Sequence, residues 1–82
     1  MVDLDPEQRE ILVWILHEGS GEVVLAPVGG SGELDLVIPR GPRRRAAERD
    51  VGRLIDLLLL RHVQRKIYRI TELGRGAAGP AT

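Results

Sequence analysis

The chain has 82 residues and no cysteine, which suits a single small domain without disulfides or thiolate-bound metals. Trp14 and Tyr68 are its only aromatic residues, so branched aliphatic side chains must fill the core. No run of apolar residues approaches the roughly 20 residues that a membrane span needs. Because the acidic N-terminus also lacks a signal-peptide pattern, we expect a cytoplasmic protein that does not contact membranes.

The net charge of zero conceals two halves of opposite sign. Residues 1–38 hold eight acids and one base, whereas residues 39–82 hold eleven bases and four acids, which gives −7 and +7. Such asymmetry is typical of a basic half that contacts nucleic acid. It equally fits a protein in which one half neutralises the other, and composition alone favours neither interpretation.

A first helix is predicted over residues 6–18. Asp5 is suited to cap it, Pro6 to occupy its first position, and Gln8 to complete a capping box. Its apolar stripe consists of Ile11, Leu12, Ile15 and Leu16.

A β-hairpin is predicted next, because two β-rich runs, 22–28 and 33–38, flank the flexible segment Gly29-Gly30-Ser31-Gly32. Pro27 removes one backbone donor from the first run. We therefore expect that strand to lie at a sheet edge, or to end near this residue.

A long second helix is predicted over residues 44–63. On it Arg45, Arg49 and Arg53 would project side by side. Gly52 costs about 1 kcal/mol relative to alanine inside a helix, so we expect a packing or close-approach reason for it. Leu57, Leu59 and Leu60 widen the apolar surface, and we expect them to be enclosed or to mediate self-association.

A third strand is predicted over residues 67–71, with a capping threonine at its end. The expected fold is a small α+β domain in which two main helices pack on one face of a three-stranded antiparallel sheet. The domain would cover residues 1–74, followed by a flexible tail over 75–82. Its predicted core contains Leu12, Ile15, Leu36, Ile38, Leu54, Leu58 and Ile70.

The segment over residues 68–75, YRITELGR, carries a family resemblance. Together with the leucine-rich helix before it, it resembles the C-terminal part of winged helix-turn-helix regulators of the MarR and PadR type. In those proteins a recognition helix is followed by a wing, and the second wing strand closes with a Thr-x-x-Gly-Arg element. Two features depart from the pattern: a hairpin takes the place of the second helix, and only residues 62–66 are left for the wing.

The resemblance implies a winged-helix transcriptional regulator that binds double-stranded DNA as a homodimer. Arg45, Arg49 and Arg53 would form the readout face. The complete predicted DNA-binding set is Arg43, Arg44, Arg45, Arg49, Arg53, Arg65, Lys66 and Arg69. The alternative interpretation is that the arginine row is a solvent-exposed helix face whose charge is balanced by nearby acids.

The alternative function is a winged-helix-like protein-interaction module, such as an adaptor, an antitoxin or a phage-type inhibitor, that binds no nucleic acid. A third reading takes the chain as a structural fragment of a larger protein. We expect no enzymatic activity, because no nucleophile is paired with a base in the sequence. We also expect no cofactor and no metal, since neither His17 nor His62 belongs to a group of His, Cys or Asp residues with metal-ligand spacing.

Overall fold

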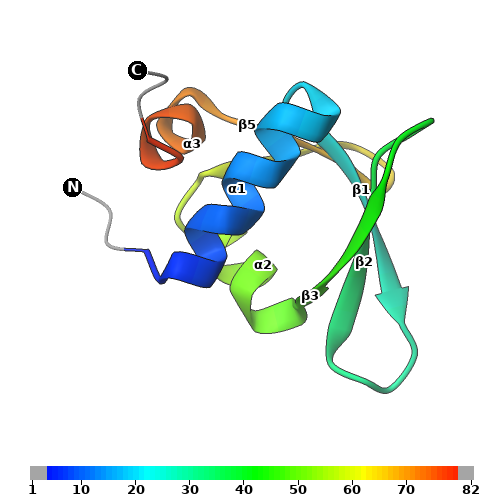
Figure 1. The fold of residues 1–82 in the computed structure, drawn as a ribbon. Coiled ribbons are helices and arrows are strands. Elements are labelled where there is room, and N and C mark those ends of the chain that lie inside the picture. The colour runs from blue at the N-terminus through cyan, green and yellow to red at the C-terminus, as the bar shows by residue number, and fades with distance from the viewer. Residues whose placement is uncertain (1–3, 80–82) are drawn as a thin grey trace.

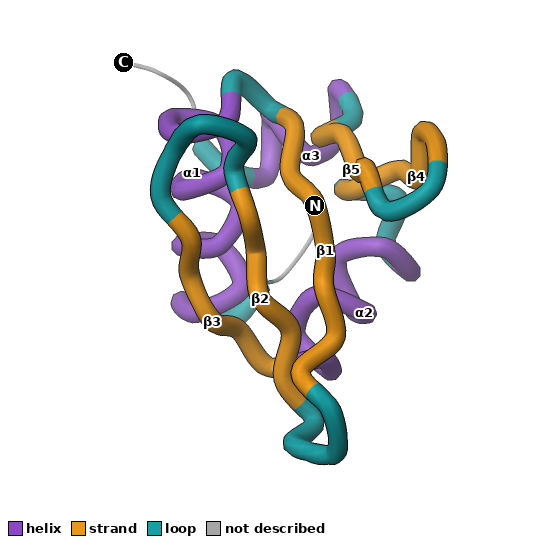
Figure 2. The backbone as a smooth tube through the Cα atoms, turned by 90° about the vertical axis from the view of Figure 1, so that its right-hand side faces the viewer, coloured by secondary structure: helices purple, strands orange, loops and turns teal. Residues whose placement is uncertain are grey.

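The computed structural model describes residues 4–79, which form three helices and five strands (Figure 1). In chain order these are α1 (Pro6–Gly19), β1 (Glu22–Val28), β2 (Glu33–Val37), β3 (Arg43–Ala47), α2 (Glu48–Asp56), β4 (Leu60–Gln64), β5 (Ile67–Ile70) and α3 (Glu72–Ala77). The strands form one antiparallel sheet in the order β3-β2-β1-β5-β4, and the helices lie behind it in Figure 2. The α+β class is therefore confirmed, but the sheet is larger than the predicted three strands.

The strongest local signals predicted the first half of the chain well. Helix α1 begins at Pro6 as expected, and the Gln8 side-chain oxygen accepts a hydrogen bond from the Asp5 backbone N–H at 3.3 Å. Strands β1 and β2 pair as the expected hairpin, with Leu25 opposite Leu36. Strand β5 joins this hairpin by pairing with β1, as predicted for the third strand.

Pro27 lies where β1 has a neighbour on one side only. The pairing of β5 with β1 ends at Val24, beyond which the Leu25 N–H still donates to the Lys66 carbonyl at 3.0 Å. Backbone groups alternate sides along a strand, so the Pro27 nitrogen faces the same, now unpaired, side. The proline therefore costs the β1–β2 ladder no hydrogen bond, which agrees with the prediction that β1 is locally an edge there.

The predicted helix over 44–63 is wrong at both ends. Residues 43–47 form β3, which pairs along its whole length with β2, and only Glu48–Asp56 is helical. Ala46 faces the core opposite Leu34, so this strand buries an alanine where the arginine-rich sequence suggested a helical turn. Residues 60–64 form β4, which pairs with β5 and makes a fuller hairpin than the five residues expected for a wing.

A chain reversal inside the leucine run explains why the helix stops. The Leu58 N–H donates to the Ile55 carbonyl at 3.0 Å, and the Leu59 N–H donates to the Leu54 carbonyl at 2.9 Å. This pair of bonds is a Schellman motif, with Leu58 in the left-handed position that glycine usually fills (φ 62°). Its side chain is 66% exposed, so the prediction that Leu58 belongs to the core is wrong.

Replacing Leu58 with glycine is expected to stabilise the protein by about 0.5–1 kcal/mol. A left-handed leucine costs roughly 1–2 kcal/mol, and the more flexible unfolded chain offsets part of the gain. Urea unfolding would measure the change. The matched control is Leu73→Gly, which alters an equally exposed leucine (58%) within helix α3 and should lower stability. Equal effects of the two substitutions would contradict the expectation.

The remaining predicted core residues are buried: Leu12, Ile15, Leu36, Ile38, Leu54 and Ile70. Leu59 and Leu60 join them, at 0% and 2% exposure, while Leu57 is half-buried against the core. Two of the three leucines expected to mediate self-association thus already pack within one chain.

The C-terminal element is a packed helix. Thr71 caps α3 by accepting a hydrogen bond from the Gly74 N–H at 3.0 Å, as predicted for a capping threonine. Helix α3 includes residues 75–77, and Ala78 is buried in the core, so the tail expected from residue 75 begins inside this element. Residues 80–82 of that tail lie outside the described residues.

Candidate interaction site

The eight residues predicted to bind DNA do not form one row. Arg45 lies on β3, whereas Arg49 and Arg53 lie on α2, so the predicted four-residue helical spacing is interrupted by the strand-to-helix junction at Ala47. The others are distributed over β3 (Arg43, Arg44), the β4–β5 turn (Arg65, Lys66) and β5 (Arg69).

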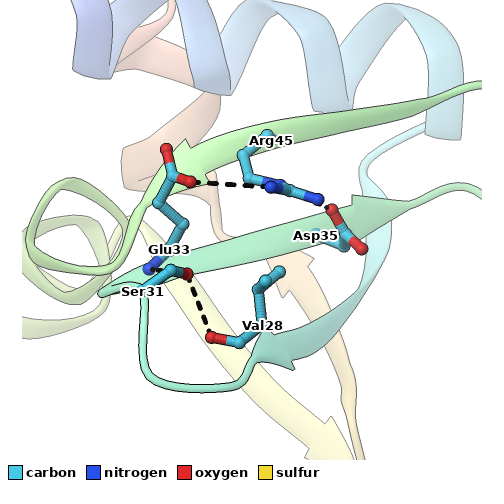
Figure 3. Close-up of polar contacts among 5 residues, drawn as sticks. All are labelled: Val28, Ser31, Glu33, Asp35 and Arg45. Carbon is cyan, nitrogen blue, oxygen red and sulfur yellow. Dashed lines mark hydrogen bonds and ion pairs between the residues drawn. The ribbon is translucent and has the colours of Figure 1, made fainter.

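Arg45 is turned toward the acids of the neighbouring strand β2. Its Nε donates to the Asp35 carboxylate at 3.1 Å, and its Nη1 lies 3.6 Å from the Glu33 carboxylate (Figure 3). The hydrogen bond and charge of Asp35 raise the pKa of the Arg45 guanidinium above its usual value. Arg45 is therefore a cross-strand partner of β2, not a member of a helical readout face.

Two more predicted DNA contacts are ion pairs with the first half of the chain. Arg44 lies 3.1 Å from Glu7 and 3.2 Å from Glu10, both on α1. Arg69 donates to Glu22 on β1, through Nε at 2.9 Å and also through Nη2. The five ion pairs of Arg44, Arg45 and Arg69 all join an acid of the first half to an arginine of the second. These ion pairs neutralise part of the charge asymmetry between the two halves of the chain.

The outward face of α2 has no excess of positive charge. Glu48, Arg49, Arg53 and Asp56 are all exposed on this nine-residue helix. Two acids thus accompany two arginines on the surface that would enter a major groove. This face therefore attracts DNA phosphates only weakly, because its two acids repel the phosphate backbone.

An open pocket of about 580 Å³ lies between α2, the β1–β2 hairpin and the β4–β5 turn. Its apolar lining consists of Leu25, Pro27, Leu34, Val51, Ile55 and Tyr68. Leu25, Pro27 and Leu34 of the β1–β2 hairpin line one side of the pocket, and Val51 and Ile55 of α2 line the other. Tyr68 is positioned by a tilted ring contact with His62, with centroids 5.1 Å apart.

Gly52 borders this pocket. Among residues 4–79, a Cβ atom built on it would meet no atom of another element within 4 Å, so the structure shows no packing or close-approach reason for this glycine there. The glycine instead widens the pocket on the α2 side. Gly52 and Pro27 are the two residues of this site that stand out in the sequence. Neither of them alone predicts a pocket.

Two further properties bear on function. Within residues 4–79 no group of three or more His, Cys, Asp or Glu side chains could hold a metal ion. None of the described helices combines the length and apolar character needed to cross a membrane.

Comparison with known proteins gives no relative from which a role could be transferred. No family model, no curated protein and no solved structure matches this chain. The function therefore has to be inferred from the contacts of the chain itself.

Proposed function

We propose that this domain is a winged-helix-type protein-interaction module that binds a segment of a partner protein in the pocket beside α2. The observation that carries the proposal is the pocket itself: of its apolar lining, Pro27 is exposed and Leu34, Ile55 and Tyr68 are only partly buried. A pocket of a few hundred Å³ lined by apolar groups with a few polar groups at its border is typical of a binding site. The ion pairs that occupy Arg44, Arg45 and Arg69 favour this function over DNA binding.

The winged-helix part of the proposal is supported by the order of the elements. Helix α2 is followed directly by the β4–β5 hairpin, and the second strand of that hairpin pairs with β1. This is the helix-then-wing order that the YRITELGR resemblance implies. The β1–β2 hairpin stands in the place of the usual second helix.

Filling the pocket tests the proposal. Random 12-residue peptides displayed on phage would be selected on the wild-type domain, and their affinities then measured for Gly52→Leu and Gly52→Ala. Both substitutions should raise helix stability by about 0.5–1 kcal/mol, because both residues favour a helix more than glycine does and a Cβ atom here meets no described atom of another element within 4 Å. Only leucine occupies the pocket, so it should weaken binding at least tenfold while alanine leaves binding nearly unchanged. Selected peptides that bind all three forms equally would overturn the proposal.

DNA binding remains the second candidate, because of the same helix-then-wing order. Its contacts would come from Arg43, Arg49, Arg53, Arg65 and Lys66. Titration of mixed-sequence duplex DNA at 50 and 200 mM salt would decide. An affinity that falls steeply with salt and is lost in Arg49→Ala would support this function. Binding absent at both salt concentrations would remove it.

A further inference from the structure

The two ends of the pocket carry opposite charges. At one end the Glu48 backbone N–H donates to the Gly32 carbonyl at 2.9 Å, which places Glu48 beside the tip of the β1–β2 hairpin. At the other end the Lys66 carbonyl accepts from the Leu25 N–H at 3.0 Å, which places the β4–β5 turn beside the middle of β1. Glu48, Arg65 and Lys66 all line the pocket.

The separation of these ends follows from the strand between them. Leu25 and the last residue of β1, Val28, are three positions apart, which corresponds to about 10 Å in an extended strand. The lining between the ends is apolar, from Pro27, Val51 and Ile55. The site thus presents negative charge, apolar surface and positive charge in sequence along one direction.

These charges are available to a partner. Glu48, Arg65 and Lys66 are exposed, and none of them forms an ion pair with another described residue. This distinguishes them from Arg44, Arg45 and Arg69, which are paired with acids of the first half. The unpaired charges line the same pocket as these apolar residues, where complementary charges would set the orientation of a bound segment.

We propose that the pocket binds an extended segment of a partner protein. Three of its residues, one basic, one apolar and one acidic in that order, face the pocket, and the residues between them face outward. This rests on the proposed interaction function and specifies its ligand. Side chains repeat every second residue on one face of an extended chain, so five residues span about 13 Å and place three side chains toward the pocket. The segment is about 3 Å longer than the roughly 10 Å between the two ends of the pocket, and its flexible charged side chains can accommodate this difference. The basic residue meets Glu48, the apolar residue enters the pocket, and the acidic residue meets Arg65 and Lys66.

The test uses the peptides selected on the wild-type domain. Their sequences should be enriched in a basic and an acidic residue four positions apart, with an apolar residue midway. The double reversal Arg65→Glu/Lys66→Glu should weaken their binding about tenfold, and changing the acidic residue of the peptide to lysine should restore it. Arg61→Glu is the matched control on the same hairpin: Arg61 is exposed on β4 and does not line the pocket, so binding should change less than twofold.

The outcomes separate this inference from the function on which it rests. Peptides that lose binding in Gly52→Leu, yet lack the charge pattern and bind the double reversal as well as the wild type, would overturn the inference and leave the interaction function standing. Peptides indifferent to Gly52→Leu would overturn both. Equal losses in Arg61→Glu and in the double reversal would also overturn the inference, because a general charge effect would then explain the binding.

Discussion

Substituting Gly74 with alanine is expected to lower the free energy of unfolding by about 3 kcal/mol, the upper end of the usual cost of overpacking. A Cβ atom at this position would collide with the carbonyl oxygen of Leu59 and lie 2.8 Å from Cγ2 of Ile70. That carbonyl cannot easily move, because it accepts the Thr71 N–H at 3.1 Å. Urea unfolding followed by Trp14 fluorescence would measure the loss.

The same helix provides the control. Gly76 is also in α3, but a Cβ atom there would have no atom of the other described residues within 4 Å outside its own helix. Gly76→Ala should therefore be neutral or stabilise the protein by up to about 1 kcal/mol. If the two alanine substitutions had the same effect, the close approach of α3 to Leu59 would not be what requires glycine.

This junction gives a structural meaning to the YRITELGR segment. The Thr71 hydroxyl donates to the Leu58 carbonyl at 2.6 Å and accepts from the Gly74 N–H at 3.0 Å, so one side chain connects the end of the leucine run to α3. Gly74 then allows the helix backbone to lie against Leu59. The threonine and the glycine of this segment therefore serve capping and close packing of α3.

Local signals decided which elements were predictable from the sequence. Helix α1 and the β1–β2 hairpin carry their own caps, breakers and alternation, and the structure agrees with their predicted ranges within a residue or two. Strand β3 carries no such signal: its pairing with β2 is a tertiary contact between residues up to fourteen positions apart. Where pairing partners determine structure, propensity alone is a weak guide.

The leucine run failed for a related reason. Four consecutive leucines are compatible with a helix, and no glycine marks the left-handed position that Leu58 occupies. The helical spacing was extended past this reversal, so Leu58 was placed in the core, and its neighbours were expected to be enclosed or to mediate self-association. The candidate pocket was equally hidden, because its lining comes from segments that are far apart in the sequence.

The charge asymmetry shows how one composition supports two readings. Residues 1–38 carry seven excess acids and residues 39–82 seven excess bases, a distribution that is compatible with DNA binding by the second half. In the fold, α1, β1 and β2 supply the acids and β3 and β5 the arginines of the five ion pairs. Exposed pairs of this kind contribute only about 0–1 kcal/mol each, so they shape the surface field more than they stabilise the fold.

The second large effect is expected at Gln8, which connects α1 to α2. Its Nε2 donates to the Asp50 carboxylate at 3.1 Å, and its Oε1 accepts the Asp5 N–H at 3.3 Å. Gln8 and Asp50 are 4% and 9% exposed, so Gln8→Ala leaves a buried carboxylate without its amide donor. We expect a loss of about 2 kcal/mol, since an unsatisfied buried acceptor costs about 1–3 kcal/mol and a charged one more.

A double-mutant cycle distinguishes this hydrogen bond from lost packing. With Gln8→Ala, Asp50→Ala and the double variant, we expect a coupling of about 1–2 kcal/mol, because removing both partners leaves neither one unsatisfied. The matched cycle uses Glu7 and Arg44, an ion pair that begins one residue earlier on α1 and is more exposed, and its coupling should stay below about 1 kcal/mol. Additive effects of Gln8 and Asp50, or a coupling no larger than that of the exposed pair, would show that burial does not strengthen this contact.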